Sequence, residues 1–260
     1  MATVETERRG PVLLLTLNRP QVRNAVDADT AVAITRAVED FADDNDARAL
    51  VVTGAGDVAF CAGADLKGAA GLLAHDAVDR AGPMGFARLD PGKPVIAAIN
   101  GFCLAGGMEL AAWCDFRISE EHAEFGVVNR RWGVPLIDGG TQRLPRIVGL
   151  GNALYLIETG AQITARQAKA MGFVQEIVPT GQSVQRAVEL GERIAEYPRQ
   201  SLAHDRSEAL GAFERALTAG IQAERESGVP TLSDPELAAA LERFLRGERP
   251  EPPRPPNDPA

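Results

Sequence analysis

The chain has 260 residues, of which 45% are hydrophobic and 24% charged, with 26 glycines and 17 prolines. This composition is typical of a soluble globular protein with many tight turns, and the length suits one α/β core with an added helical segment. The formal net charge of −9 argues against a nucleic-acid partner, because a phosphate backbone is repelled at long range.

Short apolar runs predict three buried strands in the first hundred residues. They are Val12 to Leu17, Ala49 to Thr53 and Val95 to Asn100, each bounded by Gly, Pro or Asn. Between the first two, residues 27–44 place apolar side chains near helical spacing with an acidic opposite face. The order of strand, helix and strand predicts an α/β fold.

The alternation of strand and helix continues after the third strand. We expect a Gly-rich turn, an apolar helix over residues 106–113 and a strand near residues 116–119. Thr164 suits an N-cap and Gly172 a position just past the end of a further helix, before strand character returns at residues 173–178. The pattern predicts β-β-α units stacked in sequence.

From residue 183 onward the pattern is almost wholly helical, with breaks at proline and glycine. We predict a core over residues 1–195 that holds the site. A helical segment over residues 196–248 would cover the site or form a subunit interface. Residues 249–260 are too rich in proline for a helix or a strand ladder, and we expect a flexible tail there.

Two segments of small residues follow predicted strands and leave their backbone N–H groups open. The first is Phe60 to Lys67, with the sequence FCAGADLK. The second is Asn100 to Leu110, with the sequence NGFCLAGGMEL, in which Gly106 and Gly107 begin a helix. The unused N–H groups and the positive dipole end of that helix suit a developing oxyanion.

Five ordered segments resemble the crotonase, or enoyl-CoA hydratase and isomerase, superfamily. They are NRPQVRNA at 18–25, AGADLK at 62–67, NGFCLAGGMELAAWCD at 100–115, GGTQRLPRIVG at 139–149 and ITARQAKAMGFV at 163–174. The resemblance covers nearly the whole chain and implies a spiral of β-β-α units with a C-terminal helical segment. It also implies an acyl-CoA thioester as substrate, coenzyme A as part of that substrate rather than a bound cofactor, and a homotrimer or homohexamer.

In that superfamily two backbone N–H groups hold the thioester oxygen, at positions that match Ala64 and Gly106. The resemblance therefore implies an oxyanion hole that stabilises an enolate. The superfamily also binds coenzyme A along the first turn and the AGADLK segment. The matching candidate substrate contacts are Arg23, Asn24, Ala25, Ala62, Asp65, Leu66 and Lys67. For Arg23 the alternative is solvent exposure, and for Asp65 it is bracing of its own loop.

Hydratases of the superfamily use two glutamates to hold a water and to move a proton. Glu109 matches the first glutamate, with simple stabilisation of its own helix N-terminus, worth about 0.3–1 kcal/mol, as the alternative. The second position holds Asn129, whose amide can orient a water but cannot exchange a proton near neutral pH. The usual pair of carboxylates is therefore incomplete.

A replacement carboxylate stands at Asp138, where ordinary hydratases have Gly or Ala. Other branches of the superfamily place a catalytic carboxylate in this loop, and we take Asp138 as the candidate second acid or base. The alternative is that Asp138 caps the helix that runs to Gly149. Trp132 is a candidate floor of the acyl pocket, with a packing role in the core as its alternative.

The residue types for a metal site are scarce, with three Cys, three His and no CxxC pair. We expect neither a metal nor a disulfide. No stretch reaches the roughly 18 uninterrupted apolar residues of a membrane span, and the first ten residues lack the apolar part of a secretory leader. We expect a cytoplasmic protein without a membrane partner.

The leading hypothesis is an enoyl-CoA hydratase-type lyase that adds water across the α,β double bond, with Glu109 as general base. A different enolate reaction that uses Asp138 is the first alternative, such as isomerisation, thioester hydrolysis or carbon–carbon cleavage. The second alternative is a catalytically weak acyl-CoA-binding protein.

Overall fold

The computed structural model describes residues 2–213, 229–230, 233 and 235–246. A six-stranded sheet with the order β1-β2-β3-β5-β7-β10 forms its centre. Neighbouring strands are parallel except for β1 and β2, which are antiparallel. The strands are β1 (Val4–Arg9), β2 (Val12–Leu17), β3 (Ala49–Gly54), β5 (Val95–Ile99), β7 (Phe116–Glu120) and β10 (Glu176–Val178).

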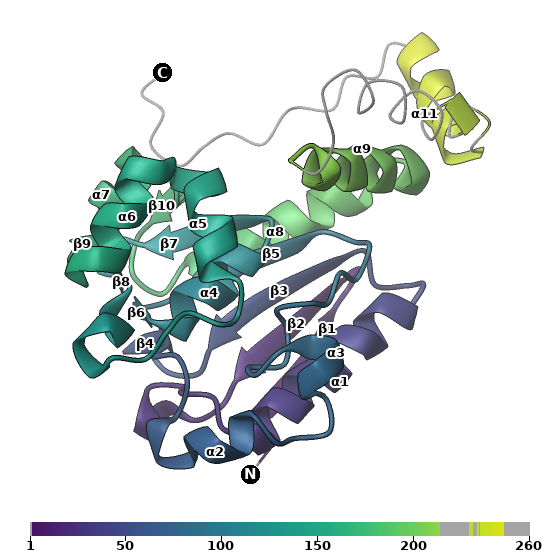
Figure 1. Cartoon of the computed structure of the whole chain (residues 1–260). Helices are drawn as coiled ribbons and strands as arrows, with labels where there is room; N and C mark the ends of the chain where they lie inside the picture. The colour runs from purple at the N-terminus through teal and green to yellow at the C-terminus, as the bar shows by residue number, and fades with distance from the viewer. Residues whose placement is uncertain (1, 214–228, 231–232, 234, 247–260) are drawn as a thin grey trace.

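Four shorter strands form a second sheet with the order β4-β6-β8-β9. They are β4 (Ala59–Cys61), β6 (Phe102–Leu104), β8 (Glu124–Gly126) and β9 (Gln162–Thr164). The successive pairs β3-β4, β5-β6 and β7-β8 each give one strand to each sheet, and helical segments follow each pair (Figure 1). The predicted spiral of β-β-α units is confirmed.

Helices surround the two sheets, and α8 packs against β3, β5 and β7 while α4 packs against α5 and the second sheet. The α-helices are α1 (Ala28–Asp43), α2 (Ala69–Leu72), α3 (Val78–Ala81), α4 (Gly106–Trp113), α5 (Gly140–Val148), α6 (Leu150–Thr159), α7 (Ala165–Ala170), α8 (Ser183–Ala195), α9 (Arg199–Gly211) and α11 (Pro235–Leu245). The 3₁₀ helices are η1 (Pro20–Val22), η2 (Leu66–Gly68) and η3 (Val128–Trp132).

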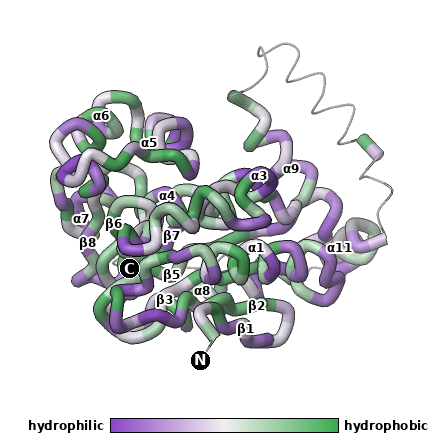
Figure 2. Tube along the Cα trace, turned by 60° about the horizontal axis from the view of Figure 1, so that its bottom comes forward, coloured by the Kyte–Doolittle hydropathy of each residue, from purple (hydrophilic) through white to green (hydrophobic). Residues whose placement is uncertain are grey.

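The core lies between the six-stranded sheet and the helices that cover it. Every residue of β3 and β5 is buried, as expected for central parallel strands. Figure 2 shows hydrophobic residues along these inner strands. Helix α1 begins where the Asp27 carboxylate accepts from Thr30 N, and it buries Ile34, Val38 and Phe41 on one face.

One strand boundary differs from the sequence-based prediction, and one strand was not predicted. Strand β10 begins at Glu176, not at Phe173, because the N–H groups of Phe173 and Val174 both donate to Ala168 O and close the end of α7. Strand β1 was not expected, since its sequence VETERR carries four charged residues and its middle is exposed. It pairs along its whole length with β2, which supplies the apolar contacts.

The predicted capping of α7 is confirmed, with Thr164 and Gln167 forming a reciprocal capping box. The predicted tail at residues 249–260 lies outside the described residues, as do residues 214–228 of the C-terminal helical segment. None of the helices in the described ranges is long and apolar enough to cross a membrane.

Candidate active site

Two backbone N–H groups lie where the two small-residue segments approach each other. Ala64 forms an isolated parallel bridge with Val26. In that bridge Val26 N donates to Gly63 O at 2.9 Å, and Asp65 N donates to Val26 O at 2.7 Å, so the N–H of Ala64 itself is not used. Gly106 is the first residue of α4, whose first N–H groups have no partner in the helix. Among the described residues neither N–H donates a hydrogen bond.

Glycine at position 63 allows the two segments to come this close. Gly63 has a φ of +93°, and a Cβ there would lie 2.7 Å from Gly106 N. Ala105, just before the helix, has a φ of 52°. A residue other than glycine adopts such a conformation at a cost of about 1–3 kcal/mol. The strained turn places Gly106 N beside Gly63.

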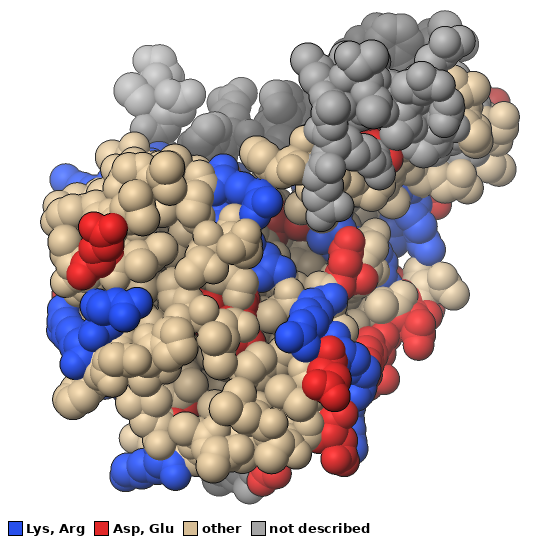
Figure 3. Space-filling view, in the orientation of Figure 1, with Lys and Arg blue, Asp and Glu red and all other residues tan. Residues whose placement is uncertain are grey.

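A cavity of about 340 Å³ opens beside these N–H groups. Of the residues singled out from the sequence, those that line it are Ala62, Ala64, Leu66, Gly106, Glu109, Asn129, Trp132 and Asp138. Its polar side chains are Glu109, Asn129 and Asp138, and the other walls are apolar. We call its exposed apolar mouth the cavity rim, formed by Leu66, Leu73, Trp132 and Ile137. Figure 3 shows few charged side chains over the centre of the face that carries α5 and α2.

Glu109 lies on the first turn of α4 and is only 4% exposed. Its Oε1 accepts hydrogen bonds from Asp138 N at 2.9 Å and from Gly140 N at 2.8 Å. The Glu109 carboxylate therefore links its own helix, α4, to the first residue of α5. Burial raises the pKa of Glu109 to about 7, the Asp138 carboxylate adds to this rise, and the Gly140 N–H opposes it. Such a carboxyl can both take and give a proton near neutral pH.

Asp138 is 2% exposed, and its Oδ1 accepts from Met84 N at 3.0 Å. Helix α5 begins after Gly139 with no side-chain cap. The alternative interpretation of Asp138 as an N-cap is therefore wrong, because its carboxylate turns toward Met84 instead. Burial raises the pKa of Asp138, whereas the Met84 N–H and the Arg143 guanidinium favour the charged form and lower it.

Asn129 reaches the cavity wall from η3 and is 7% exposed. Its Nδ2 donates to Val134 O at 2.7 Å. This bond fixes the direction of the amide, because a carbonyl oxygen only accepts. Its Oδ1 is buried and has no hydrogen-bond partner within the described part of the chain.

The turn expected to contact coenzyme A is held together by its own asparagine. Asn24 is buried, and its Oδ1 accepts from Arg19 N at 3.0 Å. Its Nδ2 donates to Ala55 O at 3.0 Å and to Ala59 O at 2.7 Å. The amide is thus committed to the backbone, and the neighbouring Ala25 is buried beside it. Any contact of Asn24 with a ligand would therefore be made through its main-chain atoms.

The charged residues of the two segments expected to bind coenzyme A, at 18–25 and 62–67, differ in their contacts. Arg23 is exposed, with its guanidinium over the Phe102 ring at 5.2 Å from the ring centre. Asp65 accepts from Lys67 N at 3.2 Å and pairs with Arg19 at 3.1 Å, so it braces its own loop. Lys67 is exposed and lies outside the cavity lining.

Trp132 is 73% exposed at the cavity rim. The packing role in the core is therefore wrong for this residue. Its ring contributes to the mouth of the cavity rather than to a buried floor.

The sequence profile described as Enoyl-CoA hydratase/isomerase matches residues 7–251 of this chain. The chain belongs to the enoyl-CoA hydratase/isomerase family. Membership makes it an enzyme of the hydratase type, which favours the enzymatic hypotheses over a binding protein without chemistry.

Individual members of the enoyl-CoA hydratase/isomerase family agree with this assignment. The probable mitochondrial enoyl-CoA hydratase of Dictyostelium discoideum is 34% identical over 249 residues, covering 95% of this chain and 90% of that protein. A carnitinyl-CoA dehydratase of Salmonella arizonae is 40% identical over 193 residues, covering 73% of each. The crystal structure of an enoyl-CoA hydratase from Mycobacterium tuberculosis H37Rv matches with a TM-score of 0.90 and 28% identity, covering 96% of this chain and 98% of that one.

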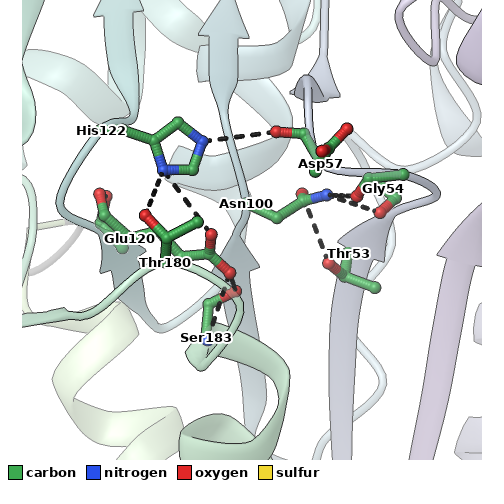
Figure 4. Close-up of polar contacts among 10 residues, drawn as sticks. Thr53, Gly54, Asp57, Asn100, Glu120, His122, Thr180 and Ser183 are labelled. Carbon is green, nitrogen blue, oxygen red and sulfur yellow. Dashed lines mark hydrogen bonds and ion pairs between the residues drawn. The ribbon is translucent and has the colours of Figure 1, made fainter.

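A second polar cluster in this hydratase-type enzyme lies at the end of β7 (Figure 4). Buried Glu120 accepts from Ser183 Oγ at 2.8 Å, and its Oε2 lies 3.7 Å from His122 Nδ1. The His122 ring also contacts Thr180 Oγ1 at 3.2 Å and Asp57 O at 3.3 Å. Because the Ser183 side chain is wholly buried, its hydroxyl cannot reach a substrate as a nucleophile. The cluster fastens the start of α8 to the sheet.

Sequence reasoning missed three groups of the candidate site. The N–H groups of Met84 and Gly140 hold the two acids, and no side-chain signal marks a backbone donor. Arg143 donates from Nη1 to Asp138 O at 3.1 Å and from Nη2 to Ala87 O at 2.6 Å. Arg143 could have been identified from the sequence, because it lies in the GGTQRLPR segment, five residues after Asp138.

Proposed function

We propose that this enzyme adds water across the α,β double bond of a 2-enoyl-CoA thioester. The observation that carries the proposal is the pair of unused N–H groups, of Ala64 and Gly106, beside a cavity that also holds Glu109. A thioester oxygen between the two donors gains negative charge as water attacks the β-carbon. Each donor aimed at that charge is worth about 10²–10³ in rate. Coenzyme A arrives as part of the substrate, and no cofactor is bound permanently.

Glu109 acts as the general base. Its Oε1 is held by two backbone N–H groups, which leaves Oε2 to take a proton from the water. The water oxygen bonds to the β-carbon while the π-electron pair moves through the α-carbon to the thioester oxygen. The enolate then collapses as the α-carbon accepts a proton from Asp138 or from protonated Glu109.

A second candidate is a different enolate reaction on an acyl-CoA, such as isomerisation, thioester hydrolysis or carbon–carbon cleavage. Two residues favour it. Asn129 cannot transfer a proton where hydratases of the superfamily have a glutamate. Asp138 is a buried carboxyl at the cavity wall, burial raises its pKa, and a carboxyl is a group that can transfer a proton.

We further infer a cytoplasmic homotrimer or homohexamer with no nucleic-acid or membrane partner. The net charge of −9 supports the absence of a nucleic-acid partner. Assembly is supported by α9, which has no buried residue over its thirteen positions and ends with Leu210 50% exposed. A neighbouring copy would cover this helix.

The test is a panel of short, long, branched and carboxylated enoyl-CoAs, followed by loss of the ultraviolet absorbance of the conjugated thioester. Wild type is expected to hydrate at least one of them. Glu109→Gln should lower kcat by about 10²–10⁴-fold, the usual contribution of general acid–base catalysis. Asp138→Asn tests the second candidate: if wild type isomerises, hydrolyses or cleaves an acyl-CoA and the variant loses that activity, the enolate reaction that uses Asp138 is favoured. If wild type hydrates no enoyl-CoA, the hydratase proposal is wrong.

A further inference from the structure

One peptide group joins His75 to Asp138. The carbonyl of this group belongs to Pro83 and its N–H belongs to Met84, two residues that line the cavity. His75 Nε2 lies 2.9 Å from Pro83 O, and Met84 N donates to Asp138 Oδ1 at 3.0 Å. The imidazole therefore contacts one end of the peptide group, and the carboxyl contacts the other end.

The contacts of the His75 ring indicate which nitrogen carries the proton. Ala77 N donates to His75 Nδ1 at 3.2 Å, so Nδ1 is the unprotonated acceptor of a neutral imidazole. The proton is then on Nε2, and Nε2 donates it to Pro83 O, because a carbonyl oxygen only accepts. Both contacts thus agree with one tautomer, and the side chain that makes them is only 9% exposed.

A hydrogen bond to a peptide oxygen makes the N–H of the same peptide group a stronger donor. Each bond in such a chain polarises the next, by roughly 10–30% per bond, and a low local dielectric strengthens every bond in it. Asp138 is 2% exposed, so its carboxyl depends on donors from the protein rather than on water. A stronger Met84 N–H stabilises the ionised carboxyl and therefore lowers its proton affinity.

Ionisable side chains from several elements face the Asp138 carboxyl. They are Glu109 on α4, Arg143 on α5, and His75 and Arg88 in the segments before and after α3. Burial raises the pKa of Asp138, the Met84 N–H opposes this rise, and the two arginines and His75 oppose it further. His75 differs from the arginines because it also reaches the carboxyl through the Pro83–Met84 peptide group.

We infer that His75 is a positioning residue that sets how readily Asp138 holds a proton, acting through the Pro83–Met84 peptide group. The inference rests on the proposed role of Asp138 as a group that gives a proton to the α-carbon. The neutral ring donates to Pro83 O, and the polarised Met84 N–H then donates more strongly to the carboxyl. Because His75 lies outside the cavity lining, it exchanges no proton with the substrate itself.

The experiment follows the protonation of Asp138 by infrared spectroscopy, from the C=O stretch of its protonated carboxyl as the pH is varied. The parent protein carries ¹³C-labelled aspartate carboxyls and Glu109→Gln, so that glutamate bands and the titration of Glu109 do not overlap the signal. The band that Asp138→Asn removes is the one to follow. His75→Leu should shift its midpoint to higher pH, because the peptide group loses a donor. His75→Gln should keep the parent midpoint, because the amide Nε2 can donate to Pro83 O.

Thr35→Val is the control for loosening of the segment that contains Pro83. Thr35 Oγ1 lies 3.0 Å from Gly85 O, two residues after Pro83, and valine removes this contact with a side chain of similar size. The segment then loses one contact while the Pro83–Met84 peptide group keeps both of its hydrogen bonds. The midpoint of Asp138 should stay at the parent value.

Three results would overturn the inference. One is an unchanged midpoint in a folded His75→Leu. Another is an equal shift in His75→Gln, which would mean that the donor to Pro83 O has no effect. The third is an equal shift in Thr35→Val, which would assign the effect to loosening of the segment. If His75→Leu does not fold, His75→Met has a more adaptable apolar side chain and is held to the same outcomes.

The pH dependence of kcat tests the proposed function separately. If Asp138 gives the proton, the alkaline limb of the kcat profile should move to higher pH in His75→Leu, because the acid stays protonated to higher pH. A kcat profile that stays in place while the infrared midpoint moves would reject the role of Asp138 in the reaction. It would leave the link between Asp138 and His75 intact.

Discussion

At the scale of single residues, Glu109 and Asp138 share one cavity but are held by different backbone donors. Glu109 Oε1 accepts two N–H groups from the loop that begins α5, whereas Asp138 Oδ1 accepts one from Met84. Burial raises the pKa of both carboxyls. In such a pair one carboxyl can be ionised while the other is protonated. One can then act as a base and the other as an acid on the same substrate.

The raised pKa of Glu109 predicts a pH-dependent cost in stability. Its pKa is about 7 in the folded chain against 4.5 for the ordinary side chain. The folded state therefore prefers the protonated form of Glu109. The contribution of this group to the free energy of unfolding is fully present below about pH 4.5 and is lost as the pH rises through 7. A rise of this size corresponds to a cost on the order of 3 kcal/mol at alkaline pH.

Glu109→Gln removes this titration and should gain stability relative to wild type as the pH rises. Between pH 5 and about pH 8, we expect the free energy of unfolding of the variant to rise by about 2–3 kcal/mol relative to that of wild type. Urea unfolding at several pH values measures it. Glu158→Gln, at an exposed position on α6, is the control and should show no such trend. A pH-independent difference for Glu109→Gln would contradict the raised pKa.

At the scale of elements, the site depends on the approach of the loop after β4 to the start of α4. Gly63 and Gly107 both face backbone at distances that leave no room for a side chain: a Cβ on Gly107 would lie 2.1 Å from Cys61 O. The small residues thus serve to bring Ala64 N and Gly106 N to one place. They do so without any titratable group.

Gly63→Ala should therefore damage the site more than an ordinary glycine substitution. The added Cβ would lie 2.7 Å from Gly106 N, and the backbone at φ +93° disfavours any side chain. We expect kcat for hydration to fall at least about 10²-fold, as for loss of one oxyanion donor. Gly149→Ala is the control, since Gly149 also has a positive φ, +77°, but a Cβ there meets nothing within 4 Å. Equal kinetic effects of both substitutions would refute the role of the close approach.

The parts of the fold and site that follow from sequence are those set by local chemistry. The strands Val12–Leu17 and Val95–Ile99, and the capping of α7 by Thr164, follow from apolar runs and capping residues. The contact of Asp138 with Met84, 54 positions away, could not be predicted, because its donor is a backbone N–H in a segment without a motif. The same holds for Asn129, whose amide direction depends on where the chain places Val134 O.

At the scale of the whole molecule, the six-stranded sheet and its helices form the body, while α9 lies on its outside (Figure 1). Arg206 on α9 is tied to that body by ion pairs to Asp90 at 2.7 Å and Asp115 at 2.8 Å. The helix is thus fixed by polar contacts while Leu210 stays exposed. An ordered helix with an exposed apolar side chain is what the proposed subunit interface requires.

Assembly predicts a defined mass in solution. Multi-angle light scattering of the full chain should give three or six times the chain mass of 27.6 kDa. Leu210→Glu places a charge in the proposed interface and should shift the mass toward that of a single chain. A monomeric wild type at micromolar concentration would contradict the proposed trimer or hexamer.

The central claim is that the N–H groups of Ala64 and Gly106 polarise a thioester carbonyl. The most direct measurement is the infrared difference spectrum of an enoyl-CoA labelled with ¹³C at that carbonyl, bound to the Glu109→Gln variant so that turnover is slow. The account predicts a carbonyl stretch at lower frequency than in solution, and recovery of the solution frequency when Gly63→Ala is added. A bound thioester whose carbonyl frequency matches that in water would contradict the claim.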